Sequence, residues 1–196
     1  MLERSIVILR QWLALGRDLA RQPSRGSVRR AQVDAAEELS LARQLRRLRE
    51  AVCRAIDASE ACAGCARGRP PPHGRWEGGF CCGGDTAELF TEAELAALKL
   101  AGTRLRHLRP RLSAAGCIFR GARGCALPPR HRPNICVGYL CNDLRRELAR
   151  RGTLDRVEAM CDELRDRFEA FARLRRRRLD RRWLDELDAQ LPNVQR

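Results

Sequence analysis

Apolar residues recur every three or four positions in three long stretches, a spacing that predicts three amphipathic helices. They are expected over residues 2–21, from about Gln32 to Ser59, and from about Leu154 to Leu187. The first apolar face is predicted to contain Leu2, Ile6, Leu9, Leu13 and Ala20, and the second Leu41, Leu45, Leu48, Val52 and Ile56. The third contains Leu154, Val157, Cys161, Leu164, Phe168 and Phe171, and continues less regularly through Leu179 and Trp183. Each of these faces needs a partner surface.

Two shorter helices are indicated by their start and stop signals. Thr91 and Glu94 form a capping-box pattern, so a helix is expected from there to about Arg109. Another is expected over residues 141–150, where Gly152 separates it from the last helix.

Two stretches, residues 61–86 and 113–140, are rich in glycine and proline and do not favour regular structure. Such loops persist in a folded domain only where something holds them. We therefore expect a mainly α fold, in which helices flank an irregular cysteine-rich metal-binding module with little or no β structure. The expected parts are an N-terminal helical segment (1–60), a cysteine-cluster metal-binding module (61–145) and a C-terminal helical segment (146–196), together forming one compact domain.

Eight of the ten cysteines fall between residues 62 and 141. The chain shows no secretory signal, and a reducing cytosol rarely keeps disulfides, so clustered thiols there usually hold metal. Four thiolates satisfy a tetrahedral zinc ion or an iron–sulfur cluster, and the sequence leaves the choice between them open. The predicted metal ligands are Cys62, Cys65, Cys81, Cys82, Cys117, Cys125, Cys136 and Cys141. A disulfide framework is the remaining alternative for these residues.

The spacing of the cysteines suggests local geometry. Cys62 and Cys65 are separated by two residues, which lets both sulfurs reach one ion. Cys117 and Cys125 bracket a stretch that can form a hairpin-like turn. Cys141 is expected at a helix N-terminus, where the helix dipole favours a thiolate.

The remaining cysteines and the histidines are less informative. Cys53 and Cys161 lie in or beside helical apolar stripes, so we expect them to pack as small apolar residues. His131 lies among the cysteines and could ligate, although a surface loop position is favoured. His107 is expected on a solvated face, and His73 carries no assignment.

The formal net charge is +14, which raises the question of nucleic acid. Half of the excess, +7, falls in residues 62–141, where thiolates bound to a metal would offset part of it. The densest basic run, residues 173–178, is followed closely by acidic residues, so a solvated helical face is favoured over a phosphate contact. Stacking aromatic residues are not interleaved with the arginines. Nucleic acid is therefore a conceivable partner but not the favoured one.

Other classes of site leave no sequence signal. No stretch has the roughly 18 or more apolar residues of a membrane-spanning helix, so no membrane partner is expected. Phosphate-binding, dinucleotide, serine-hydrolase and HExxH motifs do not occur, and no catalytic residue is identified. The expected location is the cytoplasm.

The order and spacing of the cysteines from Cys62 to Cys141 resemble the YkgJ-type cysteine-cluster family, whose members are described as putative zinc- or iron-chelating proteins. The most specific part of the resemblance is Arg-Pro-x-x-Cys-x-x-Tyr-x-Cys, which covers residues 132–141. The resemblance implies a bound metal or cluster rather than a reaction. It also points to Arg132 and Tyr139 as residues that hydrogen-bond to sulfur or pack over the site, with ordinary loop anchoring as the alternative.

We therefore expect a metal-binding cysteine-cluster protein that holds zinc or an iron–sulfur cluster through up to eight cysteines, in a structural, redox or accessory role. One alternative is a zinc-stabilised module that binds nucleic acid or protein through its arginine-rich helices. Another is an iron–sulfur-dependent enzyme or enzyme subunit, although an enzyme is not the favoured reading. The metal is the expected partner, and a protein partner remains open.

Overall fold

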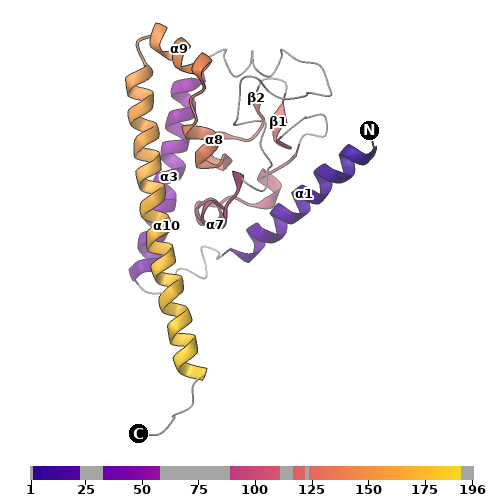
Figure 1. The fold of residues 1–196 in the computed structure, drawn as a ribbon, viewed down its shortest axis with the longest axis vertical. Coiled ribbons are helices and arrows are strands. Elements are labelled where there is room, and N and C mark those ends of the chain that lie inside the picture. Colours follow the sequence, from indigo (N-terminus) through magenta and orange to yellow (C-terminus); the bar gives the residue numbers. More distant parts are fainter. Residues whose placement is uncertain (1, 23–32, 58–88, 111–116, 122–123, 191–196) are drawn as a thin grey trace.

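The computed structural model of the protein describes residues 2–22, 33–57, 89–110, 117–121 and 124–190. Two long helices, α3 (Val33–Ile56) and α10 (Leu154–Gln190), pack side by side, and α1 (Leu2–Arg21) lies on the other side of the molecule (Figure 1). Most of the shorter elements lie between α1 and the long pair, whereas the helix α9 (Asn142–Arg150) lies at one end of the pair. Within the described residues the protein is mainly α-helical, as expected.

The shorter elements follow each other closely along the chain. They are the helices α7 (Glu92–Leu100), α8 (Asn134–Gly138) and α9 (Asn142–Arg150), the 3-10 turns η1 (Leu105–His107) and η2 (Pro129–His131), and the strands β1 (Arg120–Gly121) and β2 (Gly124–Cys125). The two strands form a single antiparallel pair. The stretch 113–140, expected to be irregular, thus contains a short helix that the sequence pattern did not predict.

The end of α7 corrects the expected boundary at Arg109. The helix ends at Leu100 because Gly102 adopts a φ of 99°, in the left-handed region that favours glycine. The backbone N–H of Thr103 donates to the carbonyl of Leu98 over 2.9 Å, which closes the helix end in a Schellman arrangement. Gly152, with a φ of 66°, ends α9 in the same way, as its position predicted.

α1 turns a different face to the protein from the one its sequence suggested. The side chains of Ile6, Leu9, Leu13 and Ala20 are exposed, whereas Ile8, Leu15 and Leu19 are buried and Trp12 is half-buried. The helix has apolar residues on two sides, so periodicity alone could not choose between them. Its docking contacts come from other elements: the indole Nε1 of Trp12 donates to the carbonyl of Leu108 over 2.6 Å, and Lys99 Nζ donates to the carbonyl of Ala20 over 2.6 Å.

The buried apolar residues form two clusters. The helix cluster is built mainly by α3 and α10 and consists of Ala35, Leu41, Ala42, Leu45, Val52, Cys53, Ala96, Ala97, Leu100, Ala101, Val137, Leu140, Leu144, Leu148, Val157, Cys161, Leu164 and Phe171. The loop cluster lies against α1 and consists of Ile8, Leu15, Leu19, Leu89, Phe90, Leu95, Leu98, Leu108, Cys117, Ile118, Phe119 and Leu127. Because α7 contributes to both clusters, it joins the two halves of the interior.

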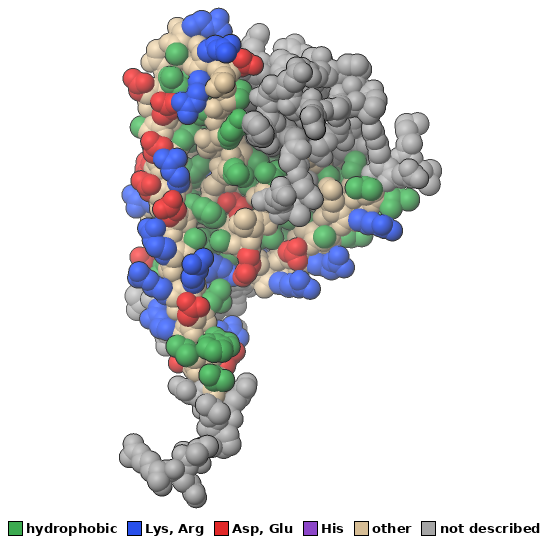
Figure 2. Space-filling view, viewed as in Figure 1, with side chains coloured by type: hydrophobic (Ala, Val, Ile, Leu, Met, Phe, Trp, Pro, Cys, Tyr) green, Lys and Arg blue, Asp and Glu red, His purple; other side chains and the backbone are tan. Residues whose placement is uncertain are grey.

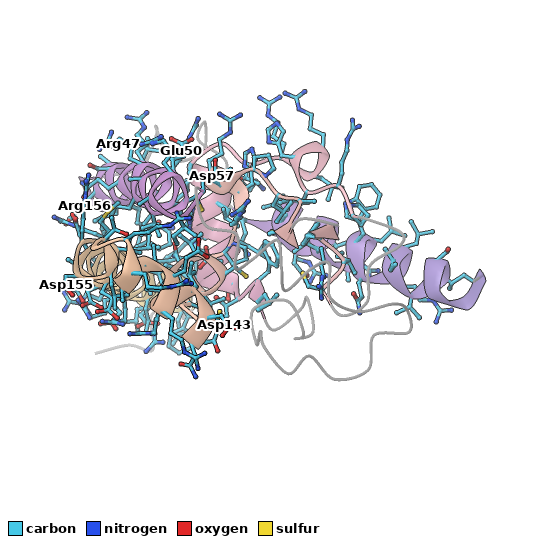
Figure 3. All side chains as sticks on the ribbon, turned by 90° about the horizontal axis from the view of Figure 1, so that it is seen from above. Arg47, Glu50, Asp57, Asp143, Asp155 and Arg156 are labelled. Carbon is cyan, nitrogen blue, oxygen red and sulfur yellow. The ribbon has the colours of Figure 1, made fainter. Side chains whose placement is uncertain are left out.

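The predicted apolar face of α3 is confirmed, since Leu41, Leu45 and Val52 are buried in the helix cluster and the rest of that face packs against it. Charged side chains of the two long helices, such as Arg47 and Arg156, are exposed and point away from the helix pair when it is seen end-on (Figure 3). No helix in the described ranges is long and apolar enough to cross a membrane.

Candidate metal site

Four of the eight predicted ligands, Cys62, Cys65, Cys81 and Cys82, lie outside the described residues. The other four lie in the described part of the chain and can be placed in the fold. Within that part, no group of three or more His, Cys, Asp and Glu side chains is close enough to hold a metal ion. A complete site would therefore need at least one cysteine from residues 58–88.

Cys117 and Cys125 lie on the two arms of a β-hairpin, as their spacing suggested. β1 pairs with β2 so that Arg120 is opposite Cys125, and the backbone N–H of Ala126 donates to the carbonyl of Phe119 over 2.7 Å. Phe119 is buried and meets the ring of Phe90 edge-on, with ring centroids 5.6 Å apart. The hairpin is thus attached to the start of α7 through an aromatic pair.

Cys136 belongs to the same region as Cys117 and Cys125. It lies on α8, and its side chain packs against the loop cluster, as does that of Cys125, while Cys117 is one of the buried members of that cluster. Cys141 is the N-cap residue of α9, as predicted, but its side chain packs against the helix cluster. The fold therefore gathers three of the four described candidates on one cluster and places Cys141 against the other.

Arg132 anchors the loop around these cysteines. Its Nε donates to the carbonyl of Leu127 over 2.8 Å and its Nη2 to the carbonyl of Cys125 over 3.3 Å. Its Nη1 also donates to sulfur, but the acceptor is Cys53 Sγ at 3.5 Å. The loop-anchoring alternative for Arg132 is thus observed, its described sulfur contact goes to a cysteine outside the predicted set, and its role at the predicted metal site stays a prediction. Tyr139 follows the last residue of α8, and its backbone N–H donates to the carbonyl of Ile135 over 3.2 Å.

Cys53 and Cys161 are buried in the helix cluster, which confirms that they pack as apolar residues. Burial raises the pKa of the Cys53 thiol, although the nearby Arg132 guanidinium acts in the opposite direction. Burial and the Asp162 carboxylate raise the pKa of Cys161 to about 11. Both thiols are therefore protonated at neutral pH, and neither is an activated nucleophile.

A buried polar network that the sequence analysis missed connects α3, α7 and α8. Arg49 Nη2 donates to Glu94 Oε1 over 2.6 Å, Arg49 Nε donates to Asn134 Oδ1 over 2.8 Å, and Asn134 Nδ2 donates to Glu94 Oε2 over 3.1 Å. Burial raises the pKa of the Glu94 carboxyl, and the Arg49 guanidinium opposes that shift. Since all three side chains are buried and bonded to one another, the network ties three elements together.

Glu94 was expected to complete a capping box, but its side chain takes part in the buried network. Thr91 does cap α7, because its Oγ1 accepts from the backbone N–H of Glu94 over 3.3 Å. The Glu94 side chain, however, points into the interior to meet Arg49 instead of capping the helix in return. A charged residue at position 49, between the apolar positions Leu45 and Val52 of α3, was the one available signal for a buried partner.

His131 is buried rather than placed on a surface loop, which corrects the expectation for it. Its Nδ1 lies 2.9 Å from Thr103 Oγ1, and its ring stacks on that of His107 with centroids 4.5 Å apart. Burial, reinforced by the nearby charges of His107 and Arg130, lowers the pKa of His131 to about 4. His131 is therefore neutral at physiological pH, and its described hydrogen bond goes to Thr103.

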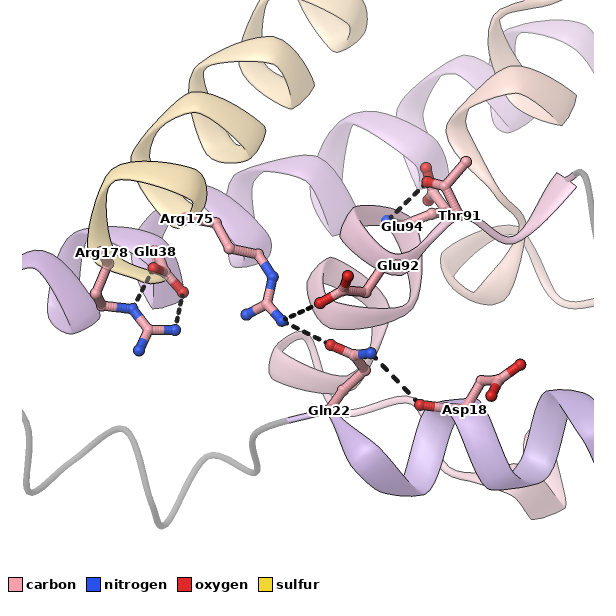
Figure 4. Close-up of polar contacts among 8 residues, drawn as sticks. All are labelled: Asp18, Gln22, Glu38, Thr91, Glu92, Glu94, Arg175 and Arg178. Atoms are coloured by element: carbon pink, nitrogen blue, oxygen red, sulfur yellow. Dashed lines mark hydrogen bonds and ion pairs between the residues drawn. The ribbon is translucent and has the colours of Figure 1, made fainter. Parts of the chain in front are cut away.

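Two arginines of the basic run of α10, Arg175 and Arg178, are paired with acidic and amide groups of the same chain (Figure 4). Arg178 makes two bonds to the buried Glu38 carboxylate, at 2.5 and 3.1 Å. Arg175, itself buried, donates to Gln22 Oε1 over 2.7 Å and to Glu92 Oε1 over 3.2 Å. These contacts hold α10 against α3, α7 and the end of α1, and they engage the guanidinium groups of Arg175 and Arg178 within the chain.

Comparison with protein-family models, curated proteins and solved structures finds no match to this chain.

Proposed function

We propose that the protein binds zinc or an iron–sulfur cluster through cysteine thiolates, in a structural, redox or accessory role. The observation that supports this most directly is that Cys117, Cys125 and Cys136 all pack on the loop cluster, although the last lies 19 positions after the first and no three described side chains are close enough to hold one metal ion. Thiolate is the ligand type that zinc and iron–sulfur clusters prefer. The resemblance to the YkgJ-type family points in the same direction.

Two of the four cysteines outside the described residues are restricted to the neighbourhood of the loop cluster by chain length. The described chain resumes at Leu89 and Phe90, and both side chains are buried in the loop cluster. Cys81 and Cys82 precede Leu89 by only eight and seven residues. An extended chain of seven residues spans at most about 25 Å, so these two sulfurs remain within reach of the hairpin.

The proposed first ligands are therefore drawn from Cys117, Cys125 and Cys136, no more than two of which lie close enough to share one ion, and they are completed by cysteines from the pair Cys81 and Cys82. Cys62 and Cys65 would join the same site or form a second one. Cys141 remains a candidate ligand, but its contact with the helix cluster makes it the last to be assigned. The metal would supply thiolate-bound positive charge at a point where short loops meet, which is how a structural site stabilises irregular chain.

Metal analysis after anaerobic purification, together with an absorption spectrum, tests the proposal. Stoichiometric zinc in a colourless protein, or iron with acid-labile sulfide in a coloured one, would support it and choose between the two metals. A protein that carries no metal after reconstitution with zinc and with iron and sulfide, and that has the same thermal stability with and without them, contradicts it.

Serine variants locate the ligands. We expect Cys136→Ser and Cys125→Ser to lower the bound metal and to destabilise the loop cluster, because each removes a thiolate. The matched control is Cys161→Ser, at a buried thiol in the helix cluster, which should cost some stability but leave the metal content unchanged. Metal loss in the control equal to that in the other two variants would show that general unfolding, not ligation, explains the result.

A further inference from the structure

The two 3-10 turns η1 and η2 carry a group of exposed arginines that lies outside the proposed metal site. The stacked rings of His107 and His131, with centroids 4.5 Å apart, bring the two turns together. The Nε of Arg109 donates to the carbonyl of Arg106 over 3.3 Å, which keeps the Arg109 side chain beside η1. We use the name basic patch for His107 and the four exposed arginines on and beside these turns, which are Arg104, Arg106, Arg109 and Arg130.

The surroundings of His107 show that positive charge converges on the basic patch. Burial lowers the pKa of His107, and the guanidinium groups of Arg106, Arg130 and Arg104 lower it further. The backbone N–H of Arg104 donates to ring Nδ1 over 3.1 Å, and Arg106 Nε lies 3.3 Å from ring Nε2. A neutral imidazole accepts at only one ring nitrogen, so one of these two N–H groups faces no acceptor on the ring. The patch therefore offers hydrogen-bond donors and positive charge to a ligand.

Exposed arginines of α10 are in a different situation. Arg165 and Arg173 each pair with a carboxylate one turn earlier on the same helix, Asp162 and Glu169 respectively. Figure 2 shows basic and acidic side chains interleaved along this helix. In the described part of the chain, by contrast, no ion pair joins an arginine of the basic patch to a carboxylate. The charge of the patch is thus available to an external anion, whereas much of the charge on α10 is balanced within the helix.

The neighbouring face of α3 extends the basic surface. η2 packs against α3, and Arg46 Nη1 of that helix donates to the carbonyl of Ala101, shortly before η1, over 3.3 Å. Arg46 also pairs with Glu50 at 3.6 Å, so it adds less net charge than the turns do. Figure 3 shows the exposed Arg47 on the same side of the molecule as nitrogen-tipped side chains of the neighbouring pink segments. The positive surface therefore continues from the turns onto α3.

The composition of the basic patch favours a phosphate backbone over other polyanions. The planar guanidinium group matches phosphate oxygens with two parallel hydrogen bonds. A membrane surface would also require apolar side chains that enter the bilayer, but in the described ranges the large exposed ones lie on α1, on and just after α8, and on α10. A single strand would require rings for base stacking, and the one ring of the patch is already stacked on His131. A duplex presents its phosphates without either requirement.

We propose that the basic patch binds the phosphate backbone of a nucleic-acid duplex. Arg104, Arg106, Arg109 and Arg130 donate to phosphate oxygens, and the contact depends on charge and not on base sequence. Binding of this kind has a Kd of about 10⁻⁴–10⁻⁶ M at physiological salt. The inference does not rest on the proposed metal site, because no residue of the patch belongs to the predicted ligand set.

Fluorescence anisotropy of a labelled duplex, titrated with the full chain over a range of salt concentrations, tests the proposal. Four phosphate contacts to DNA should make the logarithm of the association constant fall against that of the salt concentration with a slope of about −3 to −4. Arg106→Gln combined with Arg130→Gln should weaken binding at least about tenfold at low salt and make the slope shallower by about two. Duplex DNA and duplex RNA are titrated in parallel, and their affinities identify which backbone is preferred.

The matched control removes the same charge from α10. Arg165→Gln combined with Arg173→Gln alters two exposed arginines that are paired within the helix, and it should change the affinity less than about twofold. Arg106→Lys combined with Arg130→Lys keeps the charge and should keep the salt slope, which would not follow if the two guanidinium groups had only a structural role. Circular dichroism and metal content check that each variant is folded like the wild type.

The following results would overturn the proposal. One is the absence of binding to either duplex at low salt. Another is an equal effect of the two glutamine double variants, which would assign binding to net charge and not to the basic patch. A third is patch-dependent binding to phosphatidylserine vesicles with no binding to either duplex, which would assign the patch to a membrane surface.

Discussion

The helix cluster and the loop cluster are similar in kind of residue but are assembled in different ways. The helix cluster is drawn largely from two long helices, α3 and α10, whose apolar residues recur at helical spacing. The loop cluster combines one side of α1, two residues of α7 and a hairpin around Phe119, and no stretch of it has a sustained period. The first is stabilised by regular helix packing, whereas the second depends on loops that regular secondary structure does not hold.

The difference bears on the proposed metal site, which we place at the loop cluster. A core of packed helices needs no metal, and its two described buried thiols, Cys53 and Cys161, are protonated packing residues. The loop cluster carries Cys117, Cys125 and Cys136 on short irregular elements, where a cross-link between distant segments adds most. The buried network around Glu94 connects the two regions through α7.

The largest effect is expected where the two clusters join. Glu94→Ala leaves the fully buried Arg49 guanidinium without its carboxylate and should lower the free energy of unfolding by about 3–5 kcal/mol. Urea unfolding followed by circular dichroism measures this. Glu92→Ala, on the exposed side of the same helix, is the control and should cost less than about 1 kcal/mol. Equal losses of unfolding free energy in both variants would show that the buried Arg49–Glu94 pair contributes no more to stability than the exposed Glu92 contact.

Removing one buried phenylalanine from each cluster should separate their roles. Phe171→Ala and Phe119→Ala each leave a cavity and should cost about 3 kcal/mol. Only Phe119→Ala is expected to weaken metal retention as well, because Phe119 lies in the hairpin between Cys117 and Cys125. Titration with a chelator, under conditions where both variants are folded, measures the difference. Equal metal retention in the two variants would show that the hairpin does not support the proposed site.

Acid should destabilise the protein through His131, which lies beside η1 and is neutral when folded. Burial lowers its pKa from 6.5 to about 4. Between these two pH values the unfolded state therefore binds a proton at His131 and the folded state does not. The stabilising effect is complete above pH 6.5 and is lost as the pH falls towards 4, by an amount on the order of 2 kcal/mol. Denaturant unfolding at a series of pH values checks this. His131→Gln should remove that component of the acid dependence, and His107→Gln should keep most of it.

The smallest effects on stability are expected from substitutions at two glycines. Gly152→Ala forces a φ of 66° on an alanine and should cost about 1 kcal/mol. Gly138→Ala places a methyl group where no atom lies within 4 Å and should be neutral or stabilise by up to about 0.5 kcal/mol. Thermal unfolding compares the two. A loss at Gly138 as large as that at Gly152 would mean that space and backbone angle do not explain the difference.

Much of the local structure was predictable from sequence. The bounds of α1, α3, α9 and α10 agree with the expected ones to within a few residues, and Thr91 and Gly152 act at helix ends as their types suggested. The early end of α7 was also predictable, because Gly102 is a helix-ending signal within the stretch that was expected to be helical to about Arg109. The hairpin between Cys117 and Cys125 was anticipated from its spacing.

Other features could not be obtained from local pattern. α1 has apolar residues on two sides, and only its docking against Leu105 and Leu108 chose Ile8 and Leu15 over Ile6 and Leu9. Arg49, Glu94 and Asn134 are far apart in sequence and give no joint signal. The contact from Arg132 to Cys53 joins residues 79 positions apart. Residues 179–187 of α10 continue the apolar pattern of the preceding turns, yet their side chains are exposed within the described part of the chain.

The sequence by itself determined where α1, α3, α9 and α10 begin and end, and that eight cysteines lie in glycine- and proline-rich chain, because caps, breakers and periodicity act over a few residues. Only the tertiary structure decided which face of α1 is buried, which charged residues enter the interior, and that Cys117, Cys125 and Cys136 gather on one cluster while Cys141 packs on the other. The physical reason is that burial and ion pairing are set by neighbours in space, and those neighbours come from distant parts of the chain.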